Sequence, residues 1–224
     1  RGLPPDNMLV LVNGKRRHRG AVISFLGSGI SDGAQGPDIS AIPSIALKQV
    51  EVLRDGASAQ YGSDAIAGIM NFVLRDDSEG TQLEIRSGQY KEGDGDAWRV
   101  AANIGMPFTS AGFANFSVEL QDSQATSRSV QRADAQGLYD GGNTAIWNYP
   151  EPAQIWGSPD VSDDYKFVVN IGLSLDESKD FYLFGNYGER NVLGGFFFRN
   201  PTNRGGVFST DGGATRLVGD VAEA

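Results

Sequence analysis

From about residue 81 onward, hydrophobic and polar residues alternate with a period of two, the pattern of a β-strand with two different faces. In the stretch 98–108 the hydrophobic side chains fall on even positions, and small or polar ones on odd positions. The stretches 114–121 and 167–175 alternate in the same way, and 81–89 does so more weakly. A fifth stretch, 181–190, is aromatic on both faces, so its orientation stays open. We therefore predict about five strands in this region.

The predicted strands are long. Each covers roughly nine to twelve residues, against about five or six in an ordinary strand and about nine to eleven in a tilted strand that crosses a bilayer. Short links after residues 108 and 175 alternate with long links over 123–164 and after 191, an asymmetry typical of outer-membrane β-barrels. A large soluble β-sandwich or lectin also alternates and stays open as an alternative. Five strands do not close a barrel of common size, so we expect further strands beyond residue 224.

The first 75 residues follow a different pattern, in which strands and helical turns succeed one another. Between residues 15 and 39 lies a long, glycine-rich stretch with little periodicity, which indicates a functional or mobile loop. The pattern predicts a small mixed α/β unit. Its predicted strands are 8–14, which ends in an Asn–Gly turn, 49–53 and 68–75, with helical turns over 45–48 and 57–65.

The composition of the 224 residues excludes several kinds of site. There is no cysteine and a single histidine, His18, so disulfides, a cysteine nucleophile and a zinc cluster are excluded, and we expect neither a metal nor a cofactor. The net charge of -9 argues against nucleic-acid binding, and no apolar run is long enough for a transmembrane helix. Because the chain begins without methionine and ends abruptly, we expect it to be cut from a longer polypeptide.

Gly56, Gly62 and Gly68 recur at a step of six residues in the stretch RDGASAQYGSDAIAG, which raises the question of a phosphate loop. A P-loop carries lysine and then serine or threonine after its second glycine, at a shorter glycine spacing. Here five residues separate Gly56 from Gly62, and no lysine follows. We therefore predict tight turns that let the strands on either side pack closely.

The segments RGLPPDNMLVLVNGKRR and IPSIALKQVEVLRDGASAQYGSDAIAGIMNFVLR resemble the C-terminal half of the plug domain of TonB-dependent outer-membrane receptors. The resemblance covers about residues 1–75, and GGFFFRNP at 194–201 also looks like a loop of some of these receptors. It implies a mixed α/β plug segment over 1–77, followed over 78–224 by the first strands and extracellular loops of an antiparallel transmembrane β-barrel. In that family the plug fills a 22-stranded barrel.

The resemblance also implies site residues. Two family arginines, which fall on Arg1 and Arg54, pair with barrel glutamates in a lock between plug and barrel wall, and those glutamates would lie on later strands. Many relatives have a glycine and a proline after the second arginine, whereas this chain has Asp55-Gly56. The region that contacts TonB, the inner-membrane-coupled partner, is expected to be missing from this chain.

Several loop residues are candidates for ligand contact. The basic run Arg16, Arg17, His18 and Arg19 is predicted to lie in a solvated loop, and in a plug domain it could attract an anionic ligand. Ser31, Asp32 and Gln35 lie in a polar stretch that is either a ligand-contacting loop or a linker. The aromatic residues of the long loop could stack on a ligand or hold the loop on itself: Trp147, Tyr149 and Trp156.

The function that the resemblance implies is TonB-dependent uptake of a scarce small molecule across the outer membrane of a Gram-negative bacterium. An iron chelate (ferric siderophore) is favoured, with cobalamin or carbohydrate also open. The expected partners are TonB, outer-membrane lipid and the ligand, without nucleic acid, and the protein is not expected to be an enzyme. The competing hypotheses are a soluble or surface carbohydrate-binding β protein and an extracytoplasmic hydrolase that uses acidic pairs.

Overall fold

A computed structural model describes residues 3–21, 23, 32–54, 58–144, 146–148, 152–195 and 198–200. The chain forms two compact units. The first unit contains Arg1–Ser87, Trp98–Asp122 and Asp163–Arg190. The second contains Gly88–Ala97, Ser123–Ser162 and Asn191–Ala224.

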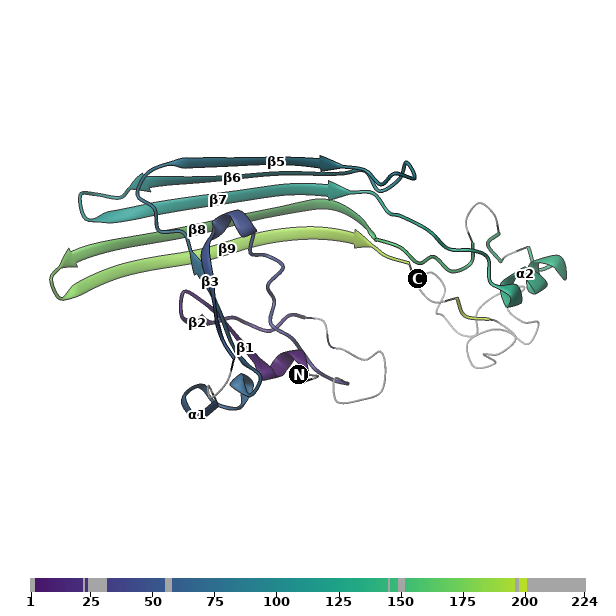
Figure 1. The fold of residues 1–224 in the computed structure, drawn as a ribbon, viewed down its shortest axis with the longest axis horizontal. Helices are drawn as coiled ribbons and strands as arrows, with labels where there is room; N and C mark the ends of the chain where they lie inside the picture. The colour runs from purple at the N-terminus through teal and green to yellow at the C-terminus, as the bar shows by residue number, and fades with distance from the viewer. Residues whose placement is uncertain are drawn as a thin grey trace, which may run out of the picture. The chain divides into compact units, whose positions relative to one another are not determined.

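The first 75 residues form a four-stranded sheet, called here the N-terminal sheet, with strand order β2-β1-β4-β3 (Figure 1). β1 runs parallel to β4, and both β2 on β1 and β3 on β4 are antiparallel. The strands are β1 Met8–Val12, β2 Lys15–Arg16, β3 Leu47–Leu53 and β4 Gly68–Leu74. The short helices between them are η1 Pro5–Asn7, η2 Ser44–Ala46, α1 Ser58–Tyr61 and η3 Ser63–Ala65.

The predicted mixed α/β unit is confirmed, with small shifts in its boundaries. The Asn–Gly turn joins β1 to β2, with Asn13 and Gly14 at φ 47° and 74°, the left-handed values that such a hairpin turn needs. The helical turn predicted at 45–48 is one residue earlier and shorter, and β3 begins already at Leu47. After β2, an isolated antiparallel β-bridge joins Arg19 to Pro37. This bridge brings together the two described ends of the long glycine-rich stretch.

Both faces of β1 are covered, because four of its five residues are buried. On one side Leu9 and Leu11 pack with Ala65 and Ile69. On the other side Val12 packs with Ala46, Leu74 and Val168, the last from a strand far along the chain. This second cluster joins the N-terminal sheet to the strands that follow it.

The remaining strands form a five-stranded antiparallel sheet in the order β5-β6-β7-β8-β9 (Figure 1). They are β5 Thr81–Gly88, β6 Ala97–Pro107, β7 Gly112–Ser123, β8 Asp160–Asp176 and β9 Lys179–Leu193. All five predicted strands are confirmed, but β8 and β9 are longer than expected, with 17 and 15 residues. The long link predicted over 123–164 was wrong at its end, because β8 begins already at Asp160 and includes Asp164.

The five-stranded sheet exposes its apolar face and buries its polar face. Ile104, Met106 and Val118 are among the exposed large hydrophobic side chains. Asn103 and Ser117, on the opposite face, are buried. A soluble sandwich would show the reverse arrangement in its core, whereas a strand facing lipid on one side shows this one.

The orientation of 181–190, which the sequence left open, is resolved in the structure. Phe184 packs against the buried cluster that contains Val12 and Val168, and Arg17 donates a hydrogen bond to Asn186. Tyr182, Phe184 and Asn186, at even positions of β9, therefore face the N-terminal sheet, where Lys15 Nζ lies 5.7 Å from the centre of the Tyr182 ring. Phe181, Leu183 and Tyr187, at odd positions, are exposed. Among the described residues, no helix is both long and apolar enough to span a membrane.

Gly68 provides a test of the packing in the N-terminal sheet. Its φ is +133°, and a Cβ there would lie 2.4 Å from the backbone oxygen of Leu53. Gly68→Ala should therefore lower the free energy of local opening of β3 and β4 by about 2 kcal/mol or more, measured by amide hydrogen exchange in the full-length protein. Gly88→Ala is the matched control, because a Cβ at Gly88 meets no atom within 4 Å. Equal protection in the two variants would contradict this packing.

Candidate functional site

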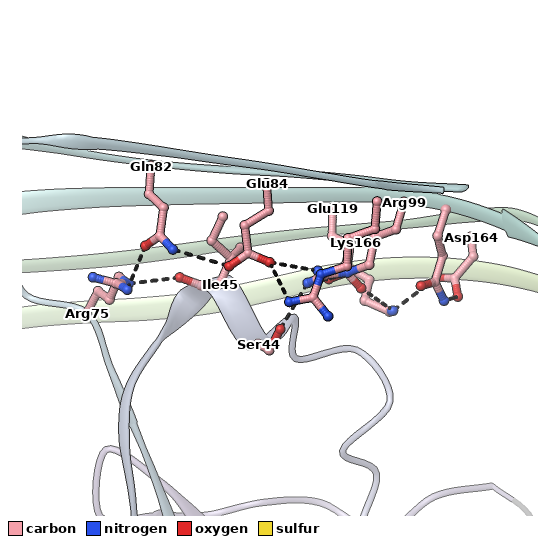
Figure 2. A network of polar contacts seen from close by, with 11 residues as sticks. Ser44, Ile45, Arg75, Gln82, Glu84, Arg99, Glu119, Asp164 and Lys166 are labelled. Atoms are coloured by element: carbon pink, nitrogen blue, oxygen red, sulfur yellow. Dashed lines mark hydrogen bonds and ion pairs between the residues drawn. The ribbon is translucent and has the colours of Figure 1, made fainter. Parts of the chain in front are cut away.

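Glu119 on β7 is the centre of a charged network on the buried face of the five-stranded sheet (Figure 2). It accepts hydrogen bonds from Arg99 Nε at 2.7 Å and from Lys166 Nζ at 2.7 Å. Its side chain is 5% exposed, so the carboxylate has lost nearly all of its hydration. The two cations compensate for that loss, because a buried charge is tolerated when it is paired and hydrogen-bonded.

The network continues on both sides of Glu119. Arg99 Nη1 lies 3.0 Å from Glu84, and Lys166 Nζ lies 3.3 Å from Asp164, whose side chain is 0% exposed. Asp164 is also 3.2 Å from Arg190 and accepts a hydrogen bond from Gln121. Three carboxylates (Glu84, Glu119 and Asp164) thus alternate with three cations (Arg99, Lys166 and Arg190), and the exposed Arg86 also lies 3.3 Å from Glu84.

Two residues connect this network to the N-terminal sheet (Figure 2). Arg99 Nη2 donates to Ser44 Oγ at 2.9 Å. Arg75, which follows β4, donates to the Ile45 carbonyl at 2.9 Å and to Gln82 Oε1 at 2.7 Å. Gln82 in turn donates to Glu84 at 3.2 Å, so a continuous set of polar contacts runs from Arg75 to Asp164.

Buried asparagines on the same face bind the backbone between the two sheets. Asn170 donates to the Arg75 carbonyl at 2.9 Å, and Asn115 donates to the Asp77 carbonyl at 3.2 Å. The backbone at Asp77 lies directly against Gly105 of β6, where a Cβ would lie 2.4 Å from the Asp77 backbone oxygen. The segment that joins β4 to β5 is therefore held against the five-stranded sheet by its backbone.

The basic run is only partly solvated. Arg16 pairs with Asp64, and Arg19 lies 4.0 Å from the same carboxylate; both arginines are more than half exposed. The solvated-loop prediction is wrong for Arg17, which is 10% exposed and donates to the Asp38 carbonyl at 2.6 Å and to Asn186 at 2.7 Å. Sequence cannot separate these four neighbours, because only the fold places Arg17 against β9.

Asp38 completes the surroundings of the basic run. Burial lowers the pKa of Arg17, and the charge of Asp38 opposes that effect. Burial would raise the pKa of Asp38, but hydrogen bonds from Ser40 and the charge of Arg17 outweigh it, so the pKa is lowered. His18 Nε2 lies 3.3 Å from the same carboxylate. A cavity of about 180 Å³ adjoins this group and is lined by Asp6, Met8, Arg16, His18, Arg19, Gln35 and Asp64, among others.

The other predicted site residues are not brought together. Arg1, Ser31, Gly56 and Tyr149 lie outside the described residues. Arg54 is exposed, and no ion pair to it occurs within the described part of the chain. Gly62 has φ +88° at the turn after α1, Asp32 is exposed, and Gln35 donates to the Gly20 carbonyl at 2.6 Å.

The second unit contains the tryptophans predicted to meet ligand. Trp147 and Trp156 are 63% and 57% exposed. The unit includes α2, Ala133–Asp140, and an ion pair in which Arg128 contacts Asp94 through two nitrogens. The hydrogen bond to Asp94 is the largest cause of the raised pKa of Arg128. In the ranges that the structure describes, no group of three or more acidic or histidine side chains could hold a metal ion.

The sequence alone did not reveal the charged network, although a signal for it exists. Glu84, Arg99 and Glu119 all lie on the polar face of an alternating strand. In a sheet exposed to water such residues would be solvated, and their partners depend on the register between strands. The sequence pattern that could have predicted the network is therefore the presence of both acidic and basic residues on the polar faces of several successive long strands.

Comparisons with known proteins agree on one family. A sequence model of the TonB-dependent receptor plug domain matches residues 1–69. A probable TonB-dependent siderophore receptor, PirA, from Acinetobacter baumannii is 32% identical over 110 residues, which are 48% of this chain and 14% of that protein.

Solved structures show the same fold. A mutant of the ferric enterobactin receptor PfeA from Pseudomonas aeruginosa, in complex with enterobactin, matches with a TM-score of 0.58 and 17% identity over 84% of this chain and 26% of that one. The siderophore receptor PirA from Pseudomonas aeruginosa matches with a TM-score of 0.52 and 17% identity over 86% of this chain and 28% of that one. The chain spans well under half of the length of these relatives, and the resemblance to TonB-dependent receptors is confirmed.

Removal of the central carboxylate tests the network. Glu119→Gln leaves Arg99 and Lys166 with one carboxylate partner each in place of two and adds one net positive charge to the buried face, so it should destabilise the full-length protein by about 3 kcal/mol. Thermal and urea denaturation in detergent micelles measure the effect. Glu177→Gln, at an exposed position in the turn between β8 and β9, is the control and should stay close to the parent. A Glu119→Gln variant as stable as this control would contradict the pairing.

The second unit allows a pH test at Asp134. A hydrogen bond from Arg132 is the largest cause that lowers the pKa of Asp134 to about 2. Because the pKa in the folded state is below that of an unfolded aspartate, about 4, the pairing stabilises the start of α2 above about pH 4 and is lost as the pH falls toward 2. Arg132→Ala should return the pKa of Asp134 toward about 4 in a carboxyl NMR titration. Arg128→Ala should leave it unchanged, and an equal shift in both variants would contradict this assignment.

Proposed function

We propose, from the premise that this chain has the sequence and fold of a TonB-dependent receptor, that it serves the energy-coupled uptake of a ferric siderophore across a Gram-negative outer membrane. The observation that carries the proposal is the inverted five-stranded sheet, with its apolar face exposed and its charged face covered by the first 75 residues. The relatives are named as siderophore receptors, which favours an iron chelate as the ligand.

The proposed architecture places residues 1–77 in the plug and 78–224 in the first strands and loops of a 22-stranded barrel. The change from one sheet to another between Leu74 and Thr81 supports a boundary there. The exposed apolar side chains of β5 to β9 would then face lipid, and the charged network would line the inside of the barrel wall.

In this proposal, the contacts between the two sheets determine how the plug can move. Arg99 to Ser44, Asn13 to Asn170, and Arg17 to Asn186 are each single side-chain hydrogen bonds. Each contributes on the order of 1 kcal/mol, or somewhat more where a charge takes part. A partner such as TonB, acting on the plug, could break such contacts one after another. The charged network within the five-stranded sheet would stay intact, because its ion pairs join strands of the same sheet.

Two groups of residues are proposed for ligand contact. Arg16, His18 and Arg19 border the cavity of about 180 Å³ and present exposed cationic or polar groups to an anionic chelate. Trp147 and Trp156 offer exposed aromatic surfaces. Aromatic faces also stack on sugars, so a carbohydrate is the second candidate ligand; cobalamin is the third.

Uptake by intact cells tests the function. The full-length protein, expressed in a Gram-negative host that lacks its own siderophore receptors, should accumulate radiolabelled iron supplied as ferric enterobactin or another ferric siderophore. Deletion of TonB from the same host should reduce accumulation to background. Accumulation that persists without TonB, or a protein that transports only carbohydrate or cobalamin, would contradict the proposal.

The proposed plug-to-barrel lock is tested at Arg54. Its loss removes a charge-assisted hydrogen bond to a barrel glutamate, and Arg54→Ala should lower the uptake rate by about tenfold. Arg86→Ala is the matched control, since Arg86 on β5 is 72% exposed and its ion pair with Glu84, at 3.3 Å, is open to solvent. Equal uptake by the parent and both variants would remove Arg54 from the lock.

A further inference from the structure

Asn13, in the turn between β1 and β2, uses both ends of its side-chain amide. Its Oδ1 accepts a hydrogen bond from the Leu74 backbone nitrogen at 2.8 Å. Its Nδ2 donates to Asn170 Oδ1, on β8, at 3.3 Å. A single side chain therefore connects the hairpin to the end of β4 and to the five-stranded sheet.

Asn170 is fixed in one orientation. It is 5% exposed, and its Nδ2 donates to the Arg75 carbonyl at 2.9 Å. Rotation of the amide by half a turn would place its oxygen against that carbonyl oxygen, so only the oxygen is left to face Asn13. The contact between the two asparagines thus has a defined direction, with Asn13 as the donor.

The same turn contains a reactive sequence, because Asn13–Gly14 is the only Asn–Gly pair in the chain. In deamidation, the Gly14 nitrogen attacks Cγ of Asn13, a C–N bond forms and ammonia leaves. Water then opens the resulting cyclic imide to aspartate or isoaspartate. The reaction needs a free Gly14 nitrogen and an Asn13 side chain that can rotate toward it, and it consumes only water.

The structure restrains both of these groups. The Gly14 nitrogen donates to Asn71 Oδ1 at 3.0 Å, and the Asn13 amide is held at both ends. Water has access nevertheless, since a groove of about 510 Å³ is lined by Asn13, Asn170, Asp76 and Tyr182, among others. Hydrogen bonding, and not exclusion of water, is therefore what would keep the turn from reacting.

We propose that Asn13 and Asn170 form an amide latch between the β1–β2 turn and the five-stranded sheet, and that Asn13 is a deamidation site which this latch protects. Release of the turn from the five-stranded sheet is expected only under the proposed function, in which the plug moves. Deamidation of a released turn would be irreversible and would convert Asn13 to aspartate or isoaspartate. Aspartate at position 13 has no amide donor, and its carboxylate would face Asn170 Oδ1, so two acceptors would oppose each other.

The latch has two neighbours on the same hairpin that serve as controls. Lys15 Nζ lies 5.7 Å from the centre of the Tyr182 ring, and Arg17 donates to Asn186. Neither contact involves the Asn13 amide. Substitutions of Asn186 therefore loosen the hairpin without freeing the reactive group directly.

The test follows deamidation in the purified full-length protein, without ligand or TonB. Protein is incubated at mildly alkaline pH, and aspartate and isoaspartate at position 13 are counted by peptide mass spectrometry. Asn170→Ala should speed deamidation of Asn13 by about fivefold, the factor that corresponds to one lost hydrogen bond. Asn186→Ala should leave the rate at the parent value. Equal rates in Asn170→Ala and the parent, or equal acceleration in both variants, would overturn the latch.

Asn170→Ser keeps the test decisive if Asn170→Ala does not fold, because the serine hydroxyl is too short to reach Asn13 and the same acceleration is expected. Hydrogen exchange at the Leu74 amide gives a second readout, which should also rise about fivefold in either Asn170 variant. Unchanged exchange at Leu74 would count against the latch. The test measures no transport, so its result is independent of the uptake experiment. The latch can be supported in a protein that takes up no iron, and it can be overturned in a protein that does.

Discussion

The pairing of Glu119 with Arg99 and Lys166 is the interaction on which the rest of the structure depends. A sheet that turns its apolar side chains outward must bury its polar ones, and buried charges are tolerated only when each has a partner. Here the partners come from neighbouring strands, so the buried charges are paired within the five-stranded sheet itself. The N-terminal sheet then needs to contribute only a few hydrogen bonds to cover that face.

Because the ion pairs lie within the five-stranded sheet and the N-terminal sheet adds only a few contacts, the two sheets can be in contact and still separate. The backbone from Arg75 to Gly80 is held by Asn170, Asn115 and the close approach at Gly105. By contrast, the hairpin of β1 and β2 contacts the five-stranded sheet through individual side chains, namely the buried Val12, which packs with Val168, and the polar Asn13, Lys15 and Arg17. An arrangement of this kind favours movement of the hairpin over movement of the segment that leads into β5. Under the proposed function, in which the plug moves, the first part to leave would then be the β1–β2 turn.

The sequence predicted the elements far better than it predicted the contacts. Period-two alternation located all five long strands, and the Asn–Gly turn located the first hairpin, because both signals are local. The orientation of β9 could not be predicted, since aromatic residues occupy both of its faces. The network around Glu119 depends on the register between β6, β7 and β8, which alternation does not specify. The different environments of Arg17 and its neighbours depend on where β9 lies, and Arg54 keeps only the role that the family resemblance implies.

Site-directed spin labelling of the full-length protein in lipid vesicles tests most directly whether the exposed apolar face of the five-stranded sheet meets lipid. These 224 residues contain no cysteine, so after replacement of any cysteine elsewhere in the full-length protein a single introduced cysteine carries the label. A nitroxide at Ile104→Cys, on the exposed apolar face, should collide mainly with dissolved oxygen, which concentrates in lipid, and little with a water-soluble nickel chelate. A nitroxide at Ser117→Cys, on the covered polar face, should collide little with either. Strong collisions with the nickel chelate at position 104 would contradict a membrane-spanning sheet and favour a soluble β protein.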